Sequence, residues 1–181
     1  MSPDVSIRPY VTQDAPALYE AARESVHEVS PWLEWCHPDY TIAESRAWIE
    51  HCRHAREAGE EYHFAIVGPD GAFLGGCGLN RLEHQHRAAN LGYWVRTSAA
   101  GRGVATAAVR QLAARAFAET ELNRLQILVA VENPASCKVA ERAGAVREAV
   151  VASRLILHGR VHDAVQYAIV RGPSAAPPAS G

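Results

Sequence analysis

The chain has 181 residues, 48% of them apolar, and a formal net charge of −2. These values are typical of one globular domain with a sizeable core, and they give no general reason to expect nucleic acid as a partner. No apolar run reaches membrane-spanning length, and the N-terminal residues lack the apolar segment of a signal peptide. We therefore expect a cytoplasmic protein with no membrane partner.

Neither the cysteines nor the histidines form a strong metal signature. The histidine clusters at 51–54 and 84–86 lack the second cluster that zinc sites pair with them at a set spacing. The cysteines form no C-x-x-C pair and are expected to be reduced and structural: Cys36, Cys52, Cys77 and Cys137. The sequence thus predicts no bound metal.

The N-terminal part of the chain predicts one strand followed by two helices. Residues 5–9 alternate apolar and polar side chains, which favours a strand. Residues 12–29 are predicted to form a helix, with Asp14 as its cap. The T-x-x-E pattern at 41–44 is a capping box, and it predicts a second helix that extends to about Ala58.

A hairpin is predicted next, from strands at 61–67 and 72–82 joined by a G-P-D-G turn. Glycine inside a strand indicates a bulge or a close contact, and the second strand holds three of them: Gly75, Gly76 and Gly78.

The remaining elements alternate between strand and helix before a final hairpin. A strand at 88–95 leads into a helix that ends near Glu119, and an apolar strand follows at 124–131. Asn133 can cap the next helix, which is predicted to end at Gly144. The final hairpin is predicted from strands at 146–157 and 162–170.

This order predicts the α/β class: one domain over 1–172, with a mixed central sheet of about seven strands flanked by about four helices. Residues 173–181 have no core-forming content and are expected to be a disordered tail.

The loop between the strand at 88–95 and its following helix contains two glycines. Glycine lets the backbone curl, and the first turn of a helix presents unpaired amides that suit an anion such as phosphate. The alternative is a plain loop-to-helix turn. The residues that could supply these donors, or add charge beside them, are Gly101, Arg102, Gly103, Val104, Ala105 and Thr106.

Two segments, "GYWVRTSAAGRGVATAAV" and "LQILVAVENPASCKVAERAGA", resemble the GNAT superfamily of acyl-CoA-dependent N-acetyltransferases. The segments "NRLEHQHRAANLGYWV" and "NPASCKVAERAGA" are most similar to the branch that acetylates the N-terminal amines of ribosomal proteins. The resemblance covers about Val5 to Val170. It implies a GNAT fold with a splayed strand pair, acetyl-CoA as the acetyl donor, and a protein N-terminus or a small-molecule amine as the acceptor. A homodimer is a further expectation.

The resemblance also assigns the residues that hold the cosubstrate. It places the pyrophosphate at 101–106, although Ala100 stands where the family has glutamine or arginine. Trp94 and Val95 would offer backbone groups to the pantetheine arm. Asn133 would also contact this arm, and Ser136 would protonate the leaving thiolate.

The sequence leaves the general base open. Many relatives have a glutamate where this chain has Asn90, and the ribosomal-protein branch uses a carboxylate near Arg154 and Leu155. Both acids are missing, so a water relay is expected, with four polar residues as candidate participants: Glu83, His84, His86 and His162.

The acceptor pocket of this fold lies between the first two helices and the last hairpin. Trp32 and Trp35 could line it or simply fill the core, and Glu34 and Asp39 could attract a cationic amine. Glu83 is a further candidate for substrate binding. Two alternatives to an enzyme stay open: a non-catalytic acyl-CoA-binding module on the same scaffold, and a purely structural α/β protein.

Overall fold

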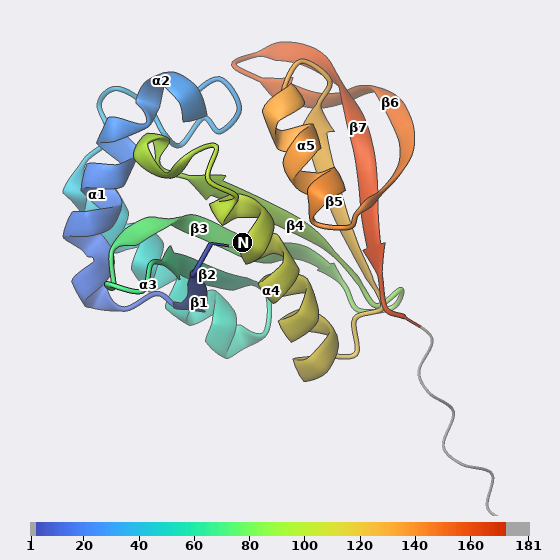
Figure 1. Ribbon diagram of the computed structural model, residues 1–181, viewed down its shortest axis with the longest axis horizontal. Coiled ribbons are helices and arrows are strands. Elements are labelled where there is room, and N and C mark those ends of the chain that lie inside the picture. The colour runs from blue at the N-terminus through green and yellow to red at the C-terminus, as the bar shows by residue number, and fades with distance from the viewer. Residues whose placement is uncertain (1–2, 173–181) are drawn as a thin grey trace, which may run out of the picture.

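Seven strands form one mixed sheet in the order β1-β2-β3-β4-β5-β7-β6 (Figure 1). The computed structural model describes residues 3–172, so the predicted tail at 173–181 lies outside the described residues. The strands are β1 (Ser6–Pro9), β2 (Tyr62–Val67), β3 (Phe73–Glu83), β4 (Ala88–Val95), β5 (Arg124–Ala130), β6 (Val146–Leu157) and β7 (Arg160–Val170). The predicted seven-stranded α/β fold is confirmed.

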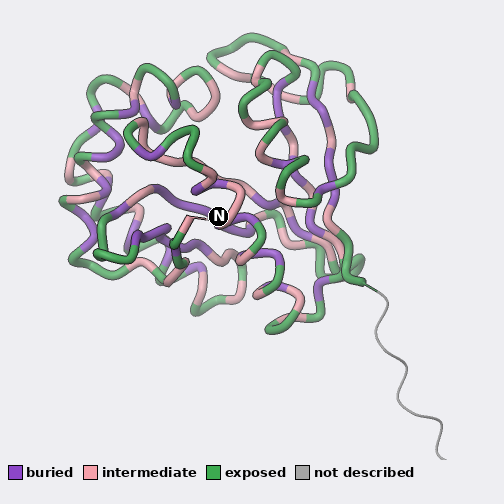
Figure 2. Tube along the Cα trace, viewed as in Figure 1, coloured by how far each residue is buried: buried purple, intermediate pink, exposed green. Residues whose placement is uncertain are grey.

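Helices cover both faces of this sheet, and the residues of β2 show how. Phe64 and Ile66 belong to the core cluster that contains α4, whereas the alternating Ala65 and Val67 belong to the cluster that contains α1 and α3. The central strands are largely buried between these helices (Figure 2). The helices are α1 (Ala15–Glu24), α2 (Val26–Val29), α3 (Ile42–Ala58), α4 (Val104–Glu119) and α5 (Pro134–Arg142). Within the described part of the chain, none of them is long and apolar enough to cross a membrane.

The first predicted helix, 12–29, is divided in the structure. A 3₁₀ turn at Thr12–Asp14 precedes α1, and the chain breaks at Ser25 before α2. The buried Ser25 hydroxyl accepts a hydrogen bond from the backbone amide of Thr97, 3.0 Å away. The sequence pattern missed this break because the partner of Ser25 lies 72 residues away.

The predicted cap of this helix is also corrected. Asp14 does occupy the N-cap position of α1, but its side chain makes no capping bond. Its carboxylate instead accepts two hydrogen bonds of 2.7 Å from Arg8 and one of 2.9 Å from the amide of Val11. Asp14 therefore ties β1 to the start of the helical segment. The predicted capping box of α3, between Thr41 and Glu44, is confirmed.

The glycines of β3 allow the close contacts that the sequence predicted. Gly75 has a φ of +153°, and a Cβ there would lie 2.2 Å from the carbonyl oxygen of Trp94. The pairing of β2 with β3 also changes register opposite this glycine, between Ile66 and Val67.

The centre of the sheet opens between β4 and β5. These parallel strands pair at only three positions: Ala88 with Arg124, Ala89 with Leu125, and Asn90 with Gln126. Beyond Asn90, β4 continues along β3 as far as Val95, while β5 continues along β7 (Figure 1). Within residues 3–172, the inner edges of both strands then have no partner strand, which is the splayed pair expected of the GNAT fold.

Three side chains of the N-terminal helices hold the segment that leaves β4. Glu24 pairs with Arg96 and accepts a 2.7 Å hydrogen bond from the amide of Ser98. Ser25 accepts from the amide of Thr97, and Glu28 accepts a 2.8 Å bond from the Thr97 hydroxyl. The chain between β4 and α4 is thereby fixed against α1 and α2.

The pairing of Glu24 with Arg96 makes a pH-dependent contribution to stability. The Arg96 guanidinium, against the opposing effect of burial, lowers the pKa of Glu24 from its ordinary value of 4.5 to about 2. Because the folded-state pKa is depressed, this stabilisation is present above about pH 4.5 and is lost as the pH falls towards 2. We predict that the free energy of unfolding of Glu24→Gln, measured by urea denaturation, falls less steeply across this interval than that of the wild type. Parallel curves would contradict the assignment.

Candidate active site

A cleft of about 610 Å³ occupies the space between the splayed strands. One wall is the free edge of β4 from Leu91 to Val95, and the other is β5 with the start of α5. Most of the residues assigned to the cosubstrate by the family resemblance line this cleft: Trp94, Val95, Gly101, Gly103, Val104, Ala105, Thr106, Asn133 and Ser136. Arg102 is exposed beside it and does not line it.

The loop before α4 presents a concave backbone to the cleft. Gly101 and Gly103 have φ values of +72° and +80°, in the left-handed region that favours glycine. Gly103 is the N-cap of α4, and its carbonyl accepts the first bond of the helix, from the amide of Ala107, 3.0 Å away. The amides of the first turn, before Ala107, have no acceptor within the helix. Free amides at the positive end of a helix dipole fit a pyrophosphate.

The opposite wall carries a hydroxyl pair. Asn133 caps α5 through a 3.1 Å hydrogen bond from the amide of Ser136, which places the Ser136 side chain at the cleft. The hydroxyl of Tyr93 lies 2.9 Å from Ser136 Oγ and also 2.9 Å from the Ser136 carbonyl oxygen. Burial raises the pKa of Tyr93 to about 12, so this hydroxyl stays protonated at neutral pH. Sequence analysis did not find Tyr93, because its partner is 43 residues away.

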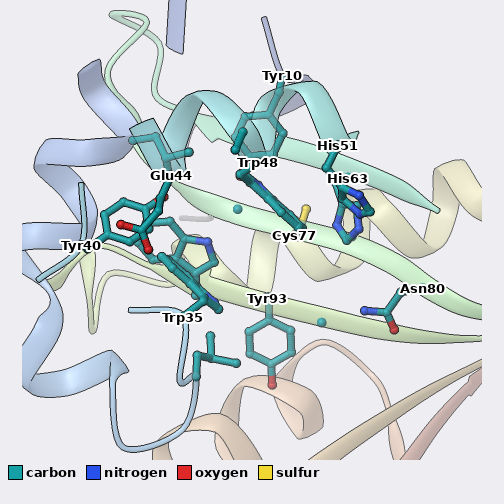
Figure 3. A pocket seen from close by; sticks show the side chains of 17 residues that line it. Tyr10, Trp35, Tyr40, Glu44, Trp48, His51, His63, Cys77, Asn80 and Tyr93 are labelled. Atoms are coloured by element: carbon teal, nitrogen blue, oxygen red, sulfur yellow. The ribbon is translucent and has the colours of Figure 1, made fainter. Parts of the chain in front are cut away.

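A second cavity, of about 550 Å³, lies between helices α1 and α3 and the sheet (Figure 3). We call it the aromatic pocket, since Tyr10, Trp35, Tyr40, Trp48 and Tyr93 line much of it. It shares five lining residues with the cleft: Leu33, Asn80, Gly92, Tyr93 and Trp94. The two cavities therefore meet at the free edge of β4.

The candidate acceptor residues lie in different places. Trp35 lines the aromatic pocket and contacts Trp94 edge to face, with ring centroids 5.0 Å apart. Trp32 lines the cleft instead. Glu34 lines neither cavity and accepts a hydrogen bond from the backbone amide of His158. Glu83 is exposed at the end of β3 and also lines neither cavity.

The structure does not bring the candidate bases to the cavities. His84 and His86 lie with Glu83 around the exposed turn between β3 and β4. His162 lies on β7, 3.3 Å from Glu132. At the positions where relatives hold carboxylates, Asn90 donates a hydrogen bond to Asn80, and Leu155 lines the cleft.

A histidine–carboxylate cluster at the aromatic pocket was not predicted. Among residues 3–172, one group of three such side chains has its ligand-type atoms within 4.8 Å of one another: His51, Glu61 and His63. The Nε2 atoms of His63 and His51 lie 2.8 and 2.9 Å from the same Glu61 oxygen. Glu61 and His63 stand two residues apart in "EYH", but His51 joins them only because α3 folds onto β2.

Comparison with known proteins agrees with this geometry. The acetyltransferase (GNAT) domain family matches residues 4–146. The "Putative ribosomal N-acetyltransferase YdaF" of Bacillus subtilis (strain 168) is 39% identical over 102 residues, which are 56% of this chain and 56% of that protein. The ribosomal-protein-serine acetyltransferase of Escherichia coli (strain K12) is 32% identical over 103 residues, 57% of this chain and 58% of that protein. The chain thus aligns with just over half the length of each.

A solved structure of Mycobacterium smegmatis RimJ in complex with a CoA-disulfide is 27% identical and superposes with a TM-score of 0.84. The superposition covers 92% of this chain and 81% of that one. The chain therefore belongs to the GNAT family of acetyltransferases.

The left-handed glycine at the start of α4 gives a direct test of the loop. We predict that Gly103→Val weakens acetyl-CoA binding by about 2 kcal/mol or more, because a branched side chain strains the loop and obstructs phosphate approach. Calorimetry measures this affinity. Gly71→Val is the matched control, since Gly71 has a φ of +81° in a turn that lines neither cavity. Unchanged affinity in a folded Gly103→Val protein would contradict the loop's role.

Proposed function

We propose that the protein transfers the acetyl group of acetyl-CoA to a primary amine, and that this amine is the N-terminus of a protein. The observation that carries the proposal is the junction of the two cavities at β4. A cosubstrate in the cleft and an amine in the aromatic pocket would meet at Gly92, Tyr93 and Trp94. Holding two reactants together in this way supplies much of the acceleration of a bimolecular transfer.

Acetyl-CoA supplies the activated acetyl thioester. The residues of the cleft fit it along its length: the glycine loop offers amides to phosphate, and the unpaired edge of β4 offers backbone groups to the amide-rich pantetheine arm. Arg102 adds positive charge beside the loop. The RimJ structure is a complex with a CoA-disulfide, which supports this assignment.

Ser136 and Tyr93 supply the proton that the leaving thiolate needs. Tyr93 has one proton, and when it donates this proton to Ser136 Oγ rather than to the Ser136 carbonyl oxygen, the Ser136 proton is free to point into the cleft. The raised pKa of Tyr93 keeps that phenol as a donor behind Ser136. In this arrangement Ser136 is the general acid, and Tyr93 is its positioning partner.

The aromatic pocket suits an ammonium group attached to a larger molecule. Trp35 and Trp48 line this pocket together with Glu44, and aromatic rings and a carboxylate both attract cations. A cavity of about 550 Å³ has room for more than the amine and its first carbon. The names of the B. subtilis and E. coli relatives, which refer to ribosomal substrates, favour a protein N-terminus over a small-molecule amine.

Thiol release from acetyl-CoA tests the proposal against a panel of peptides with free N-terminal serine or alanine, polyamines and aminoglycosides. We expect peptide acetylation that an N-terminal formyl block abolishes. We also expect Ser136→Ala to lower kcat by roughly tenfold to a thousandfold with unchanged acetyl-CoA affinity. Ser6→Ala, an exposed change on β1, is the control.

Three outcomes would count against the proposal. Acetyl-CoA binding without turnover of any amine would favour a non-catalytic module. Turnover of a polyamine or an aminoglycoside alone would overturn the protein acceptor. A normal kcat for Ser136→Ala would overturn the role of Ser136.

A further inference from the structure

A cross-strand row of one histidine and two glycines runs from β2 to the free edge of β4. His63 on β2 pairs with Gly78 on β3, which in turn pairs with Gly92 on β4. Cross-strand neighbours point to the same face of a sheet, so these three residues face the aromatic pocket together. Two glycines beside one histidine leave an open trough that spans two strand spacings, about 10 Å.

The His63 ring extends into this trough. A Cβ on Gly78 would lie 2.2 Å from His63 Nδ1, closer than to any other atom of the ring. A Cβ on Gly92 would meet nothing within 4 Å. Glycine at 78 therefore leaves room for the imidazole, and glycine at 92 leaves space beyond it, where both cavities are lined by the same residue.

Glu61 determines which nitrogen of His63 faces the trough. The Nε2 atom lies 2.8 Å from Glu61 Oε2, so it is the donor to this carboxylate. The ring is buried, and Trp48 packs edge to face against it at 4.7 Å. With its proton on Nε2, the neutral ring presents a free lone pair at Nδ1, directed over Gly78.

We propose that His63 is the general base of the transfer and accepts the proton of the acceptor amine at Nδ1, and that Glu61 is a positioning residue that fixes its tautomer. This inference rests on the proposed function. The site takes a primary amine whose nitrogen lies in the trough over Gly92, beside the His63 ring that occupies the space over Gly78. His63 would take over the role of the carboxylates that are missing from this chain at the positions of Asn90 and Leu155.

The proton and electron balance of the step is complete. The amine lone pair forms the N–C bond, the C–S bond breaks, and its electron pair leaves on sulfur. The nitrogen loses one proton to His63 Nδ1, which becomes an imidazolium paired with Glu61, and the sulfur gains one proton from Ser136. His63 then releases the Nδ1 proton to water, which restores the tautomer with its proton on Nε2 beside Glu61, and Ser136 is reprotonated from water.

Several charged or titratable groups face His63. Glu61 directly precedes β2, and His51 and Arg56 lie on α3. Cys52 on α3 and Tyr10, which interacts with Trp48, are the next titratable groups. The polar neighbours on β3 and β4, Asn80 and Asn90, do not titrate. Burial lowers the pKa of His63 although Glu61 raises it, so the ring is neutral at pH 7 and loses this function as the pH falls.

The experiment compares His63→Gln, which keeps the side chain's bulk, with the wild type, using the peptide that the wild type acetylates. We expect kcat to fall by about a hundredfold or more while acetyl-CoA affinity changes less than twofold.

In the wild type, kcat/KM should show an enzyme pKa below the ordinary histidine value, at the same pH for peptides of different basicity. In His63→Gln, the fall of kcat/KM at low pH that reports this enzyme pKa should be absent. Added imidazole should partly restore the activity of His63→Ala.

Two further measurements, on the wild-type protein, test the role of His63 even if its variants fold poorly. Histidine ¹⁵N NMR of the wild type should show His63 neutral at pH 7 with its proton on Nε2, and Glu61→Gln should change this tautomer balance or raise the acidity of the ring. Dialysis against a chelator should leave activity unchanged. A charged His63 at pH 7, or activity lost on chelation and restored by Zn²⁺, would overturn the inference.

The failures of the two proposals differ. Wild-type turnover with a His63→Gln rate within threefold of it, or an apparent pKa that follows the acceptor, would overturn the base and leave the transferase standing. No turnover by the wild type would overturn both. His51→Ala is the matched control within the cluster and should retain more activity than His63→Gln, because His51 does not reach Gly78.

Discussion

The three-residue pairing of β4 with β5 is the constraint on which the rest of the molecule depends. A parallel pair in the middle of a sheet is ordinarily bonded along its whole length, and an unmade buried backbone hydrogen bond costs about 1–3 kcal/mol. Here β4 leaves β5 after Asn90, although β5 remains paired with β7 at seven positions. Water or another chain of amides and carbonyls can satisfy these exposed edges, and this supports the proposal that the cleft takes an extended, amide-containing ligand.

Other interactions hold the opening in shape. Glu24, Ser25 and Glu28 fix the chain that leaves β4, so the loop before α4 points its amides at one end of the cleft. The bond of Tyr93 with Ser136 crosses the opening from β4 to α5. The same strand thus carries the wall of the cleft, the partner of the proposed general acid and the floor of the proposed acceptor trough.

Local sequence patterns predicted most of the strands and helices, and the family resemblance predicted most of the residues that line the cleft between β4 and β5. Strand alternation, the Thr41–Glu44 box and the Asn133 cap act over a few residues, so they can be read directly from the chain. The break at Ser25 and the Tyr93–Ser136 bond depend on partners 72 and 43 residues away. His63 could not be found in the same way, because its setting requires the register of three strands and a helix folded onto them.

Hydrogen–deuterium exchange with and without acetyl-CoA tests the central claim, that the splay between β4 and β5 is held open for this cosubstrate. The account predicts that bound acetyl-CoA slows exchange at the free edge of β4, residues 92–95, and in the loop and first turn at 101–106. Exchange on β6, which lines the cleft only near its end, should change little. Acetyl-CoA that binds and leaves exchange at both segments unaltered would contradict the account.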